Sequence, residues 1–256
     1  MDLANKIAVI TGGASGLGEA TVRRFVSAGA KVAIFDLNDE RGEALVSELG
    51  KSVAYFNVNV TDEDQVAKAI SGVEDTFGPA HICCNFAGIA AGAKVLGKDG
   101  PHKLSAFRKV IDINLIGSFN VLRLCAESMM KNDPITEDGQ RGVIINTASV
   151  AAFEGQIGQA AYSASKGAIV GMTLPIARDL ATSGIRCNTI APGLIHTPLF
   201  EALPEPVYES LSLQPLNPRR LGKADEVAKV AQFIVENDYV NGETIRVDGG
   251  IRMQPK

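Results

Sequence analysis

The stretch KIAVITGGASGLG, residues 6–18, decides the fold. Its first half is apolar and predicts a buried strand, and a helical pattern begins at Leu17. Between the two, Gly12, Gly16 and Gly18 let the backbone turn sharply and approach a pyrophosphate closely. The N–H groups and the dipole at the start of a helix favour a bound anion. We therefore expect this turn to bind a dinucleotide.

The spacing of these glycines separates the turn from other phosphate-binding loops. It is G-x-x-x-G-x-G, whereas many dinucleotide folds carry G-x-G-x-x-G. No G-K-[ST] sequence follows, which argues against the loop of nucleoside triphosphatases. A glycine cluster alone is often only a tight turn. Its place between a strand and a helix, at the start of the chain, favours the dinucleotide.

Short apolar runs alternate with helical patterns along the whole chain. Seven runs predict strands: Lys6–Thr11, Lys31–Asp36, Val53–Val58, His81–Asn85, Val143–Thr147, Arg186–Ile190 and Thr244–Val247. Such continuous apolar strands indicate a sheet that is covered on both faces. The regular alternation predicts an α/β fold with a doubly wound parallel sheet of the Rossmann type and helices on both faces.

The helical patterns and the polar interruptions complete this outline. The longest helical patterns cover about Leu104–Met130 and Ala161–Thr182. Polar, glycine-containing stretches at Ala91–Lys103 and Asn132–Arg141 predict surface insertions, the first beside the rim of the site. Because no linker, repeat or low-complexity tract divides the sequence, we expect residues 1–256 to form a single domain.

Charge and composition argue against several classes of protein. The net charge of −4 gives no basic footprint for nucleic acid, so we expect no nucleic-acid partner. No apolar run reaches the ~20 residues that span a bilayer, and the N-terminus shows neither a signal peptide nor an Arg-rich presequence. We therefore expect a cytoplasmic protein with no membrane partner. The cysteines lie in apolar segments and predict reduced core thiols and no metal site; they are Cys83, Cys84, Cys125 and Cys187.

Asp36 ends the second predicted strand, about 20 residues beyond the glycines. An acid at this position can bind the adenosine ribose diol, and it repels a 2′-phosphate. Neither Ser15 nor Leu37 offers a cation for that phosphate. The sequence therefore favours NAD over NADP as the cofactor. The alternative is an ordinary turn aspartate after a strand.

A second stretch, SVAAFEGQIGQAAYSASKGAIVG at residues 149–171, places Tyr162 and Lys166 on one helical face among small side chains. The small neighbours leave room for a flat ring such as nicotinamide. Tyrosine, with a pKa near ~10, is a poor base at neutral pH, but an ammonium and a positively charged nicotinamide lower that pKa. We expect Tyr162 to exchange a proton with a reacting hydroxyl or carbonyl, and Lys166 to tune it. A helical Tyr/Lys pair alone is usually a surface contact.

These pieces together resemble the short-chain dehydrogenase/reductase family. The matching segments occur in the family's order over nearly the whole chain: TGGASGLG (11–18), NFAG (85–88), NLIG (114–117), Ser149, YSASK (162–166) and PGLIHT (192–197). The resemblance implies that Ser149 hydrogen-bonds the substrate oxygen, that Tyr162 is the acid/base and that Lys166 also holds the nicotinamide ribose. It assigns Asn114 to a helix distortion that anchors a water on the proton relay.

The resemblance also implies a set of cofactor contacts, in which Ile195 and Thr197 reach the carboxamide. The full set is Gly12, Ser15, Gly16, Leu17, Gly18, Asp36, Asn59, Val60, Asn85, Ala87, Gly88, Tyr162, Lys166, Pro192, Gly193, Ile195 and Thr197. Two positions depart from the family pattern. Many members carry Asp where Asn59 stands, although an Asn carbonyl still accepts a hydrogen bond from adenine. Phe86 occupies the variable slot of NFAG.

A narrower resemblance, to the family's type II 3-hydroxyacyl-CoA dehydrogenases, is carried by residues 140–181 and by DGGIRMQP at residues 248–255. This multifunctional group also oxidises 2-methyl-branched substrates and some hydroxysteroids. The resemblance implies oxidation of an acyl-CoA substrate in fatty acid or isoleucine degradation, and a homotetramer. The alternatives are a hydroxysteroid or other secondary-alcohol dehydrogenase and an NAD-binding scaffold. A scaffold has no need of Ser149, Tyr162 and Lys166 together.

Substrate contacts are less marked in the sequence. We expect Ser149, Tyr162 and Gln159 to touch the substrate. Residues 196–221 contain an apolar set that predicts either a lid over an acyl chain or an amphipathic helix packed on the body: Leu199, Phe200, Leu203, Val207, Tyr208 and Leu211. Basic residues in or beside the first insertion predict either contacts to the CoA phosphates or a solvated cluster: Lys94, Lys98, Lys103 and Arg108.

Overall fold

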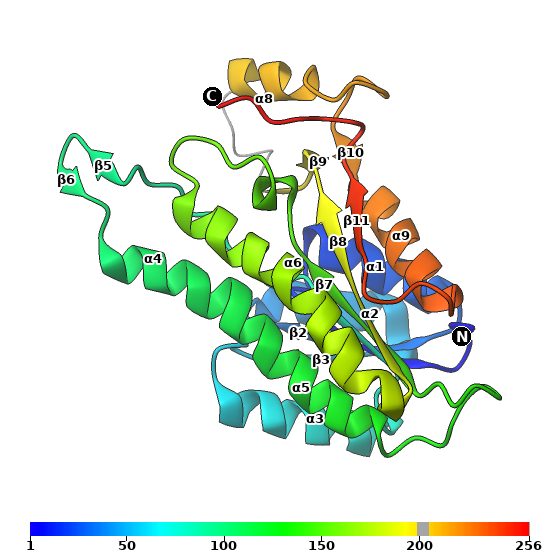
Figure 1. Cartoon of the computed structure of the whole chain (residues 1–256). Helices are drawn as coiled ribbons and strands as arrows, with labels where there is room; N and C mark the ends of the chain where they lie inside the picture. The colour runs from blue at the N-terminus through cyan, green and yellow to red at the C-terminus, as the bar shows by residue number, and fades with distance from the viewer. Residues whose placement is uncertain (199–204, 256) are drawn as a thin grey trace.

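A seven-stranded parallel sheet forms the centre of the computed structural model, which describes residues 1–198 and 205–255 apart from the side chains of residues 206 and 207. The strand order is β11-β8-β7-β4-β1-β2-β3, and every neighbouring pair is parallel (Figure 1). The strands are β1 Ile7–Thr11, β2 Lys31–Asp36, β3 Val53–Asn57, β4 Ile82–Asn85, β7 Gly142–Thr147, β8 Ile185–Pro192 and β11 Thr244–Val247. The predicted α/β fold class is confirmed.

All seven predicted strands are present, and their ends lie within two residues of the predicted ones. The reason is visible in the central strands, since every residue of β1, β7 and β8 is buried. A strand covered on both faces is mostly apolar, so the sequence marks it clearly, although β8 also buries Arg186, Asn188 and Thr189.

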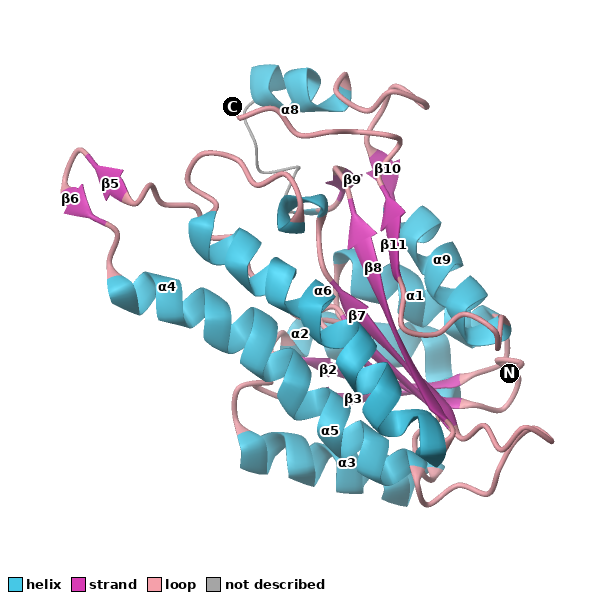
Figure 2. Ribbon diagram, in the orientation of Figure 1, coloured by secondary structure: helices cyan, strands magenta, loops and turns pink. Residues whose placement is uncertain are grey.

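Helices cover both faces of the sheet (Figure 2). They are α1 Gly16–Ser27, α2 Asp39–Leu49, α3 Glu63–Phe77, α4 Leu104–Ile111, α5 Gly117–Met129, α6 Ala160–Leu180, α8 Glu205–Ser212 and α9 Ala224–Glu236. One core cluster packs α1, α2 and α9 against the sheet, and the other packs α3, α5 and α6. Cys84 belongs to the first cluster and Cys83 to the second, so these adjacent residues face opposite sides of β4. All four cysteines are buried free thiols.

The helical pattern predicted for Leu104–Met130 is interrupted in the structure. A π-helical turn over Asp112–Ile116 separates α4 from α5. Asn114 lies in this turn and is fully buried. Its amide donates to the carbonyl of Ile89 over 3.0 Å and its oxygen accepts from the N–H of Ile89 over 2.8 Å. The distorted turn therefore ties the helix to the segment that follows β4.

Smaller elements lie at the edge of the sheet where the parallel strands end. The first insertion forms an antiparallel hairpin, β5 Leu96–Gly97 with β6 Gly100–Pro101. The second, at residues 132–141, is a loop between α5 and β7 at the opposite edge, where the strands begin. Figure 2 shows the hairpin and α8 beyond the edge where the strands end. Two further short strands, β9 Ile195–His196 and β10 Gly222–Lys223, pair in parallel and join the two ends of the segment that carries α8. Within the described part of the chain, no helix combines the length and apolarity needed to cross a bilayer.

Candidate active site

The glycine turn after β1 has no room for side chains. Gly12 has a φ of +63°, and a Cβ there would lie 2.8 Å from the backbone nitrogen of Ala87. A Cβ on Gly18 would lie 2.1 Å from the carbonyl oxygen of Gly12. The Ser15 side chain caps no N–H of α1. The first N–H groups of the helix therefore remain available to an anion, with the positive end of the helix dipole behind them.

Asp36 stands at the carboxyl end of β2, beside this turn. Its carboxylate accepts hydrogen bonds from the backbone N–H groups of Ala14 at 3.1 Å, Leu37 at 2.8 Å and Asn38 at 3.1 Å. These bonds fix the carboxylate at the rim of a cavity of about 620 Å³ that opens to solvent. The acid is therefore held in place next to the glycine turn, as binding of a ribose diol requires.

The cavity beside Asp36 collects the residues expected around adenosine. It is lined by Gly12, Phe35, Asp36, Leu37, Val58, Asn59, Val60, Ala87, Gly88, Ile89 and Ile113. The Asn59 side-chain oxygen already accepts from the N–H of Thr61 at 3.1 Å and from its hydroxyl at 2.9 Å. A contact from adenine to that oxygen therefore competes with bonds inside its own turn.

A second cavity, of about 640 Å³, holds the residues expected at the nicotinamide. Its lining is Leu17, Phe86, Gly88, Ile89, Ala90, Thr147, Ala148, Ser149, Tyr162, Lys166, Pro192, Gly193, Ile195 and Thr197. The two cavities share Gly88 and Ile89, so they form one path along the carboxyl ends of the strands. This is where an open parallel sheet binds its ligand, next to β1, where the strand order reverses.

Tyr162 and Ser149 meet in this second cavity. Ser149 follows β7, and its hydroxyl accepts a hydrogen bond from the N–H of Ala151 at 3.1 Å. Burial raises the pKa of Tyr162 above its ordinary value of 10.0, and the hydrogen bond with Ser149 acts in the opposite direction. The pKa of Tyr162 is thus raised, and the predicted lowering of this pKa by Lys166 is not observed.

Lys166 lies one helical turn beyond Tyr162 on α6. Its side chain is buried, and its ammonium donates a hydrogen bond of 2.6 Å to the carbonyl oxygen of Thr147. The nitrogen lies 5.8 Å from the centre of the Tyr162 ring. Burial lowers the pKa of Lys166 from 10.5 to about 8. A positive charge next to the phenol is therefore present at neutral pH but is costly to hold there.

Asn114 connects the π-helical turn to α6, the helix that carries Tyr162 and Lys166. Besides its paired bonds to Ile89, its amide donates to the Ser165 hydroxyl at 3.1 Å, and that hydroxyl donates to the carbonyl of Tyr162 at 2.7 Å. A Cβ on Gly88 would lie 3.1 Å from the Asn114 side-chain oxygen. The Asn114 side chain therefore holds the cavity wall at Ile89 against the turn of α6 that presents Tyr162.

Four predicted cofactor residues do not line either cavity: Ser15, Gly16, Gly18 and Asn85. Asn85 is buried, and its amide donates to Asn146 at 2.9 Å and to the carbonyl of Ser118 at 3.3 Å. It therefore cross-links β4 to β7 below the cavity. Ser15 lies beside the glycine turn, outside the lining of the cavities described. Gly16 approaches the site differently, since a Cβ there would lie 3.6 Å from the side chain of Thr197.

Gln159 faces a third cavity, of about 770 Å³, which Tyr162 also lines. The remaining lining comes from residues 90–94 and 157–158, so the first insertion forms one wall and Lys94 stands in it. The side-chain oxygen of Gln159 accepts from the N–H of Gln156 at 2.9 Å. Tyr162 is thus open both to the cavity of Lys166 and to a neighbouring space beside the insertion.

The predicted lid, residues 196–221, is described in part. Leu199, Phe200 and Leu203 lie outside the described residues, as does the side chain of Val207. Tyr208 and Leu211 pack on a small cluster of the body: Val150, Leu194, Leu221 and Ile251. The Tyr208 hydroxyl also lies 3.3 Å from the imidazole Nδ1 of His196. The described part of α8 therefore rests on the body as an amphipathic helix.

The predicted basic cluster does not converge on one point. Lys94 lines the third cavity, whereas Lys98 is exposed on the hairpin and Lys103 is exposed at the start of α4. Arg108 lines a separate open groove on α4 with Leu104. Its side chain faces solvent.

The geometry fits a dinucleotide. Gly12 and Gly18 make a concave turn that a Cβ would fill, and Asp36 is fixed beside it. Two connected cavities run from this acid to Tyr162. Sequence reasoning missed several lining residues, namely Phe35, Val58, Ile89, Ala90, Ile113, Thr147 and Ala148. These residues stand next to the recognised motifs in the sequence, and that position is the signal that could have identified them.

Known proteins resemble this chain along its whole length. The sequence profile described as short chain dehydrogenase matches residues 6–207. The 3-hydroxyacyl-CoA dehydrogenase type-2 of Homo sapiens is 55% identical over 97% of this chain and 96% of that protein. The protein of that name from Drosophila melanogaster is 52% identical over 98% of this chain and 99% of its own length. The crystal structure of 3-hydroxyacyl-CoA dehydrogenase type-2 from Mycobacterium avium has a TM-score of 0.94, with 41% identity and both chains fully covered.

Proposed function

We propose, since this chain belongs to the short-chain dehydrogenase family, that it is an NAD-dependent dehydrogenase of 3-hydroxyacyl-CoA thioesters, including 2-methyl-branched ones. It is an oxidoreductase that uses a nicotinamide cofactor. The observation that carries the proposal is the position of Tyr162, which lines both the cavity of Lys166 and the space beside the first insertion. The names of the relatives support the acyl-CoA substrate. Degradation of fatty acids or of branched-chain amino acids such as isoleucine would use this reaction.

In the proposed reaction, Ser149 holds the substrate oxygen and the Tyr162 oxygen takes the hydroxyl proton. Bound NAD would supply the hydride acceptor for carbon 3 and a positive charge that favours the phenolate. Lys166 supplies a second positive charge 5.8 Å from the ring centre. Through its bonds to Ile89 and Ser165, Asn114 fixes the cavity wall at Ile89 relative to the turn of α6 that carries Tyr162. The protein thus orients the alcohol and moves one proton.

A substrate panel tests the proposal. NADH formation should be fastest with 3-hydroxybutyryl-CoA or 2-methyl-3-hydroxybutyryl-CoA and much slower with a 17β-hydroxysteroid or a small secondary alcohol. A steroid preference would replace the thioester proposal by the hydroxysteroid alternative. Absence of turnover with every substrate, in a protein that binds NADH, would instead support the scaffold alternative.

We expect Asp36 to set the choice of NAD over NADP. A 2′-phosphate beside a fixed carboxylate is opposed by about 4 kcal/mol per charge pair at ~4 Å near a protein surface, before screening. The preference in kcat/KM should therefore reach ~10²-fold or more, and Asp36→Asn should reduce it by an order of magnitude. The asparagine keeps the size of the side chain and an acceptor for Leu37 and Asn38. Equal use of both cofactors by the unmodified protein would contradict the assignment.

We propose a homotetramer built on the long helices. Apolar side chains stand exposed on this side of the molecule, with Ile116 at 50%, Phe119 at 47% and Leu174 at 44% exposure. These residues lie on the π-helical turn, α5 and α6, and a neighbouring copy would cover them. Light scattering should give about four times the mass of the chain. A monomer at micromolar concentration would contradict this.

A further inference from the structure

The end of β11 is bonded to the loop that joins Ser149 to Tyr162. Arg246, in β11, makes paired bonds of 2.7 and 2.9 Å to the carboxylate of Glu154. The same guanidinium donates to Asp248 at 2.7 Å and lies 5.2 Å from the centre of the Phe153 ring. We call residues 150–159 the catalytic loop. Its middle is therefore held by a forked ion pair and a stacked ring, the geometry in which arginine binds most specifically.

The residues after β11 continue this contact. We call residues 248–255 the tail. The side-chain amide of Gln156 donates to the carbonyl of Gln254 at 2.9 Å, and the N–H of Ile157 donates to the carbonyl of Pro255 at 3.0 Å. The catalytic loop is thus fastened to the C-terminal end of the chain by the ion pair of Arg246 with Glu154, by its contact with the Phe153 ring and by two hydrogen bonds. Val150 is buried in one cluster with Ile251 of the tail, whereas Phe153 and Ile157 are about half exposed. Apolar burial therefore holds the start of the loop and contributes little to its middle.

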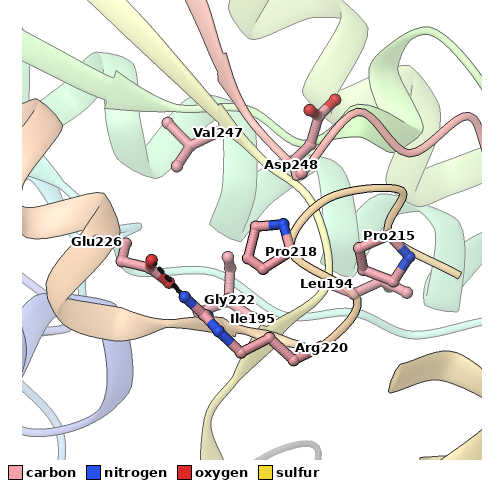
Figure 3. Close-up of a pocket in the computed structure, with 10 residues that line it drawn as sticks. Leu194, Ile195, Pro215, Pro218, Arg220, Gly222, Glu226, Val247 and Asp248 are labelled. Atoms are coloured by element: carbon pink, nitrogen blue, oxygen red, sulfur yellow. Dashed lines mark hydrogen bonds and ion pairs between the residues drawn. The ribbon is translucent and has the colours of Figure 1, made fainter. Parts of the chain in front are cut away.

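The tail also holds the far end of the segment that carries α8. The carbonyl of Gly249 accepts from the N–H of Leu216 at 2.9 Å and from that of Asn217 at 3.1 Å. Beside this contact lies a cavity of about 420 Å³, where Pro215, Pro218 and the Arg220–Glu226 ion pair face Val247 and Asp248 (Figure 3). This part of the segment is therefore fastened to the tail by two backbone hydrogen bonds.

We propose that Arg246 is a positioning residue for the reaction. Through Glu154 and the tail it fixes the catalytic loop, and the loop in turn sets Ser149 against Tyr162 and Gln159 against the third cavity. A misplacement of about 1 Å at reacting groups costs up to ~10²-fold in rate. The identity of the substrate rests on the proposed function, whereas the holding of the loop does not.

The kinetic test uses Arg246→Lys and a chain shortened by residues 254–256. Each should lower kcat/KM for the best substrate about tenfold while the Kd for NADH stays within twofold, because the glycine turn and Asp36 are untouched. In the combined variant, the fold-loss in kcat/KM should be smaller than the product of the two single fold-losses, since both changes act through one loop. Arg23→Lys is the matched control. It breaks a forked pair with Glu48 on the surface of α1 and should leave kcat/KM unchanged.

An activity-independent measurement accompanies the kinetics. Hydrogen exchange should quicken in peptides covering residues 150–159 in both variants and stay unchanged over residues 7–27. Unchanged exchange in the loop, or kcat/KM within twofold of the unmodified enzyme, would overturn the proposal. A parallel fall in NADH affinity would also overturn it, because the damage would then be general. Rejection of acyl-CoA by the unmodified enzyme would overturn only the substrate assignment, and the variants would then be compared on the alcohol that it accepts.

Discussion

Tyr162→Phe is expected to lower kcat by roughly 10²–10⁴-fold, the usual effect of removing a general base. The substitution keeps the ring that fills the buried site and removes the oxygen that we propose takes the proton. The Ser149 hydroxyl still accepts a hydrogen bond from the N–H of Ala151, so the first residues of the catalytic loop should keep their conformation. NADH binding should persist, because the glycine turn and Asp36 lie elsewhere. Fluorescence titration with NADH and initial rates of NADH formation measure the two quantities separately.

The pH dependence gives this prediction a second arm. At saturating NAD, oxidation by the unmodified enzyme should rise with pH through an ionisation well below 10.0, the ordinary pKa of tyrosine. Burial raises the pKa of Tyr162, whereas the positive charges of Lys166 and of a bound nicotinamide would lower it during turnover. Tyr239→Phe, at a fully exposed tyrosine, is the control and should change neither rate nor profile. If Tyr162→Phe kept most of its kcat, another group would be the base.

The sheet could be predicted because burial on both faces leaves a plain mark in the sequence. Every residue of β7 and β8 is buried, and both strands were found within two residues of their ends. The interruption between α4 and α5 leaves no such mark in the periodicity, and only the resemblance to the family pointed to a helix distortion at Asn114. It is set by the paired bonds between Asn114 and the backbone of Ile89, a contact between residues 25 positions apart. Amphipathic periodicity reports only the face of a helix and carries no information about that contact.

The site shows the same division between local and distant causes. The glycine turn and the Tyr162–Lys166 pair are local patterns, so spacing marks them as candidates, and their occurrence together with Ser149 indicates their chemistry. The orientation of Asn85 is different, because Asn146 on the neighbouring strand decides it. The carbonyl of Thr147 that receives the ammonium of Lys166 is equally invisible, since any residue type supplies a carbonyl. The contacts of Arg246 with Glu154 join positions 92 apart and have no sequence motif.

Replacing Lys166 by methionine is expected to lower kcat by about 10²-fold or more and also to weaken NADH binding. The substitution removes the positive charge 5.8 Å from the phenol ring, so the proton acceptor becomes harder to ionise. It also removes the contact to the nicotinamide ribose that resemblance to the family implies. Tyr162→Phe should leave NADH affinity unchanged, so the pair of variants separates proton transfer from cofactor binding. Full NADH affinity in Lys166→Met would contradict the second role of the lysine.

Stability of the ligand-free protein should respond to Lys166→Met with a distinctive pH dependence. The pKa of Lys166 falls from 10.5 to about 8 on folding because its ammonium is desolvated. The unfolded chain therefore binds the extra proton between these values, and the stability of the unmodified protein rises as the pH rises through this window. Below pH 8 the cost of burying the charge is fully present. Methionine avoids it but leaves the Thr147 carbonyl without its 2.6 Å donor, a loss that does not vary with pH.

Lys166→Met should therefore be more stable, relative to the unmodified protein, at pH 7 than at pH 10. The difference between the two free energies of unfolding, variant minus unmodified protein, should thus be larger at pH 7. Urea unfolding at the two pH values measures this difference without cofactor or substrate. Lys68→Met, on the exposed side of α3, is the matched control and should show the same difference at both pH values. If the difference for Lys166→Met is the same at both pH values, the ammonium of Lys166 in the unmodified protein is not held at a desolvation cost. The charge beside Tyr162 would then need another explanation.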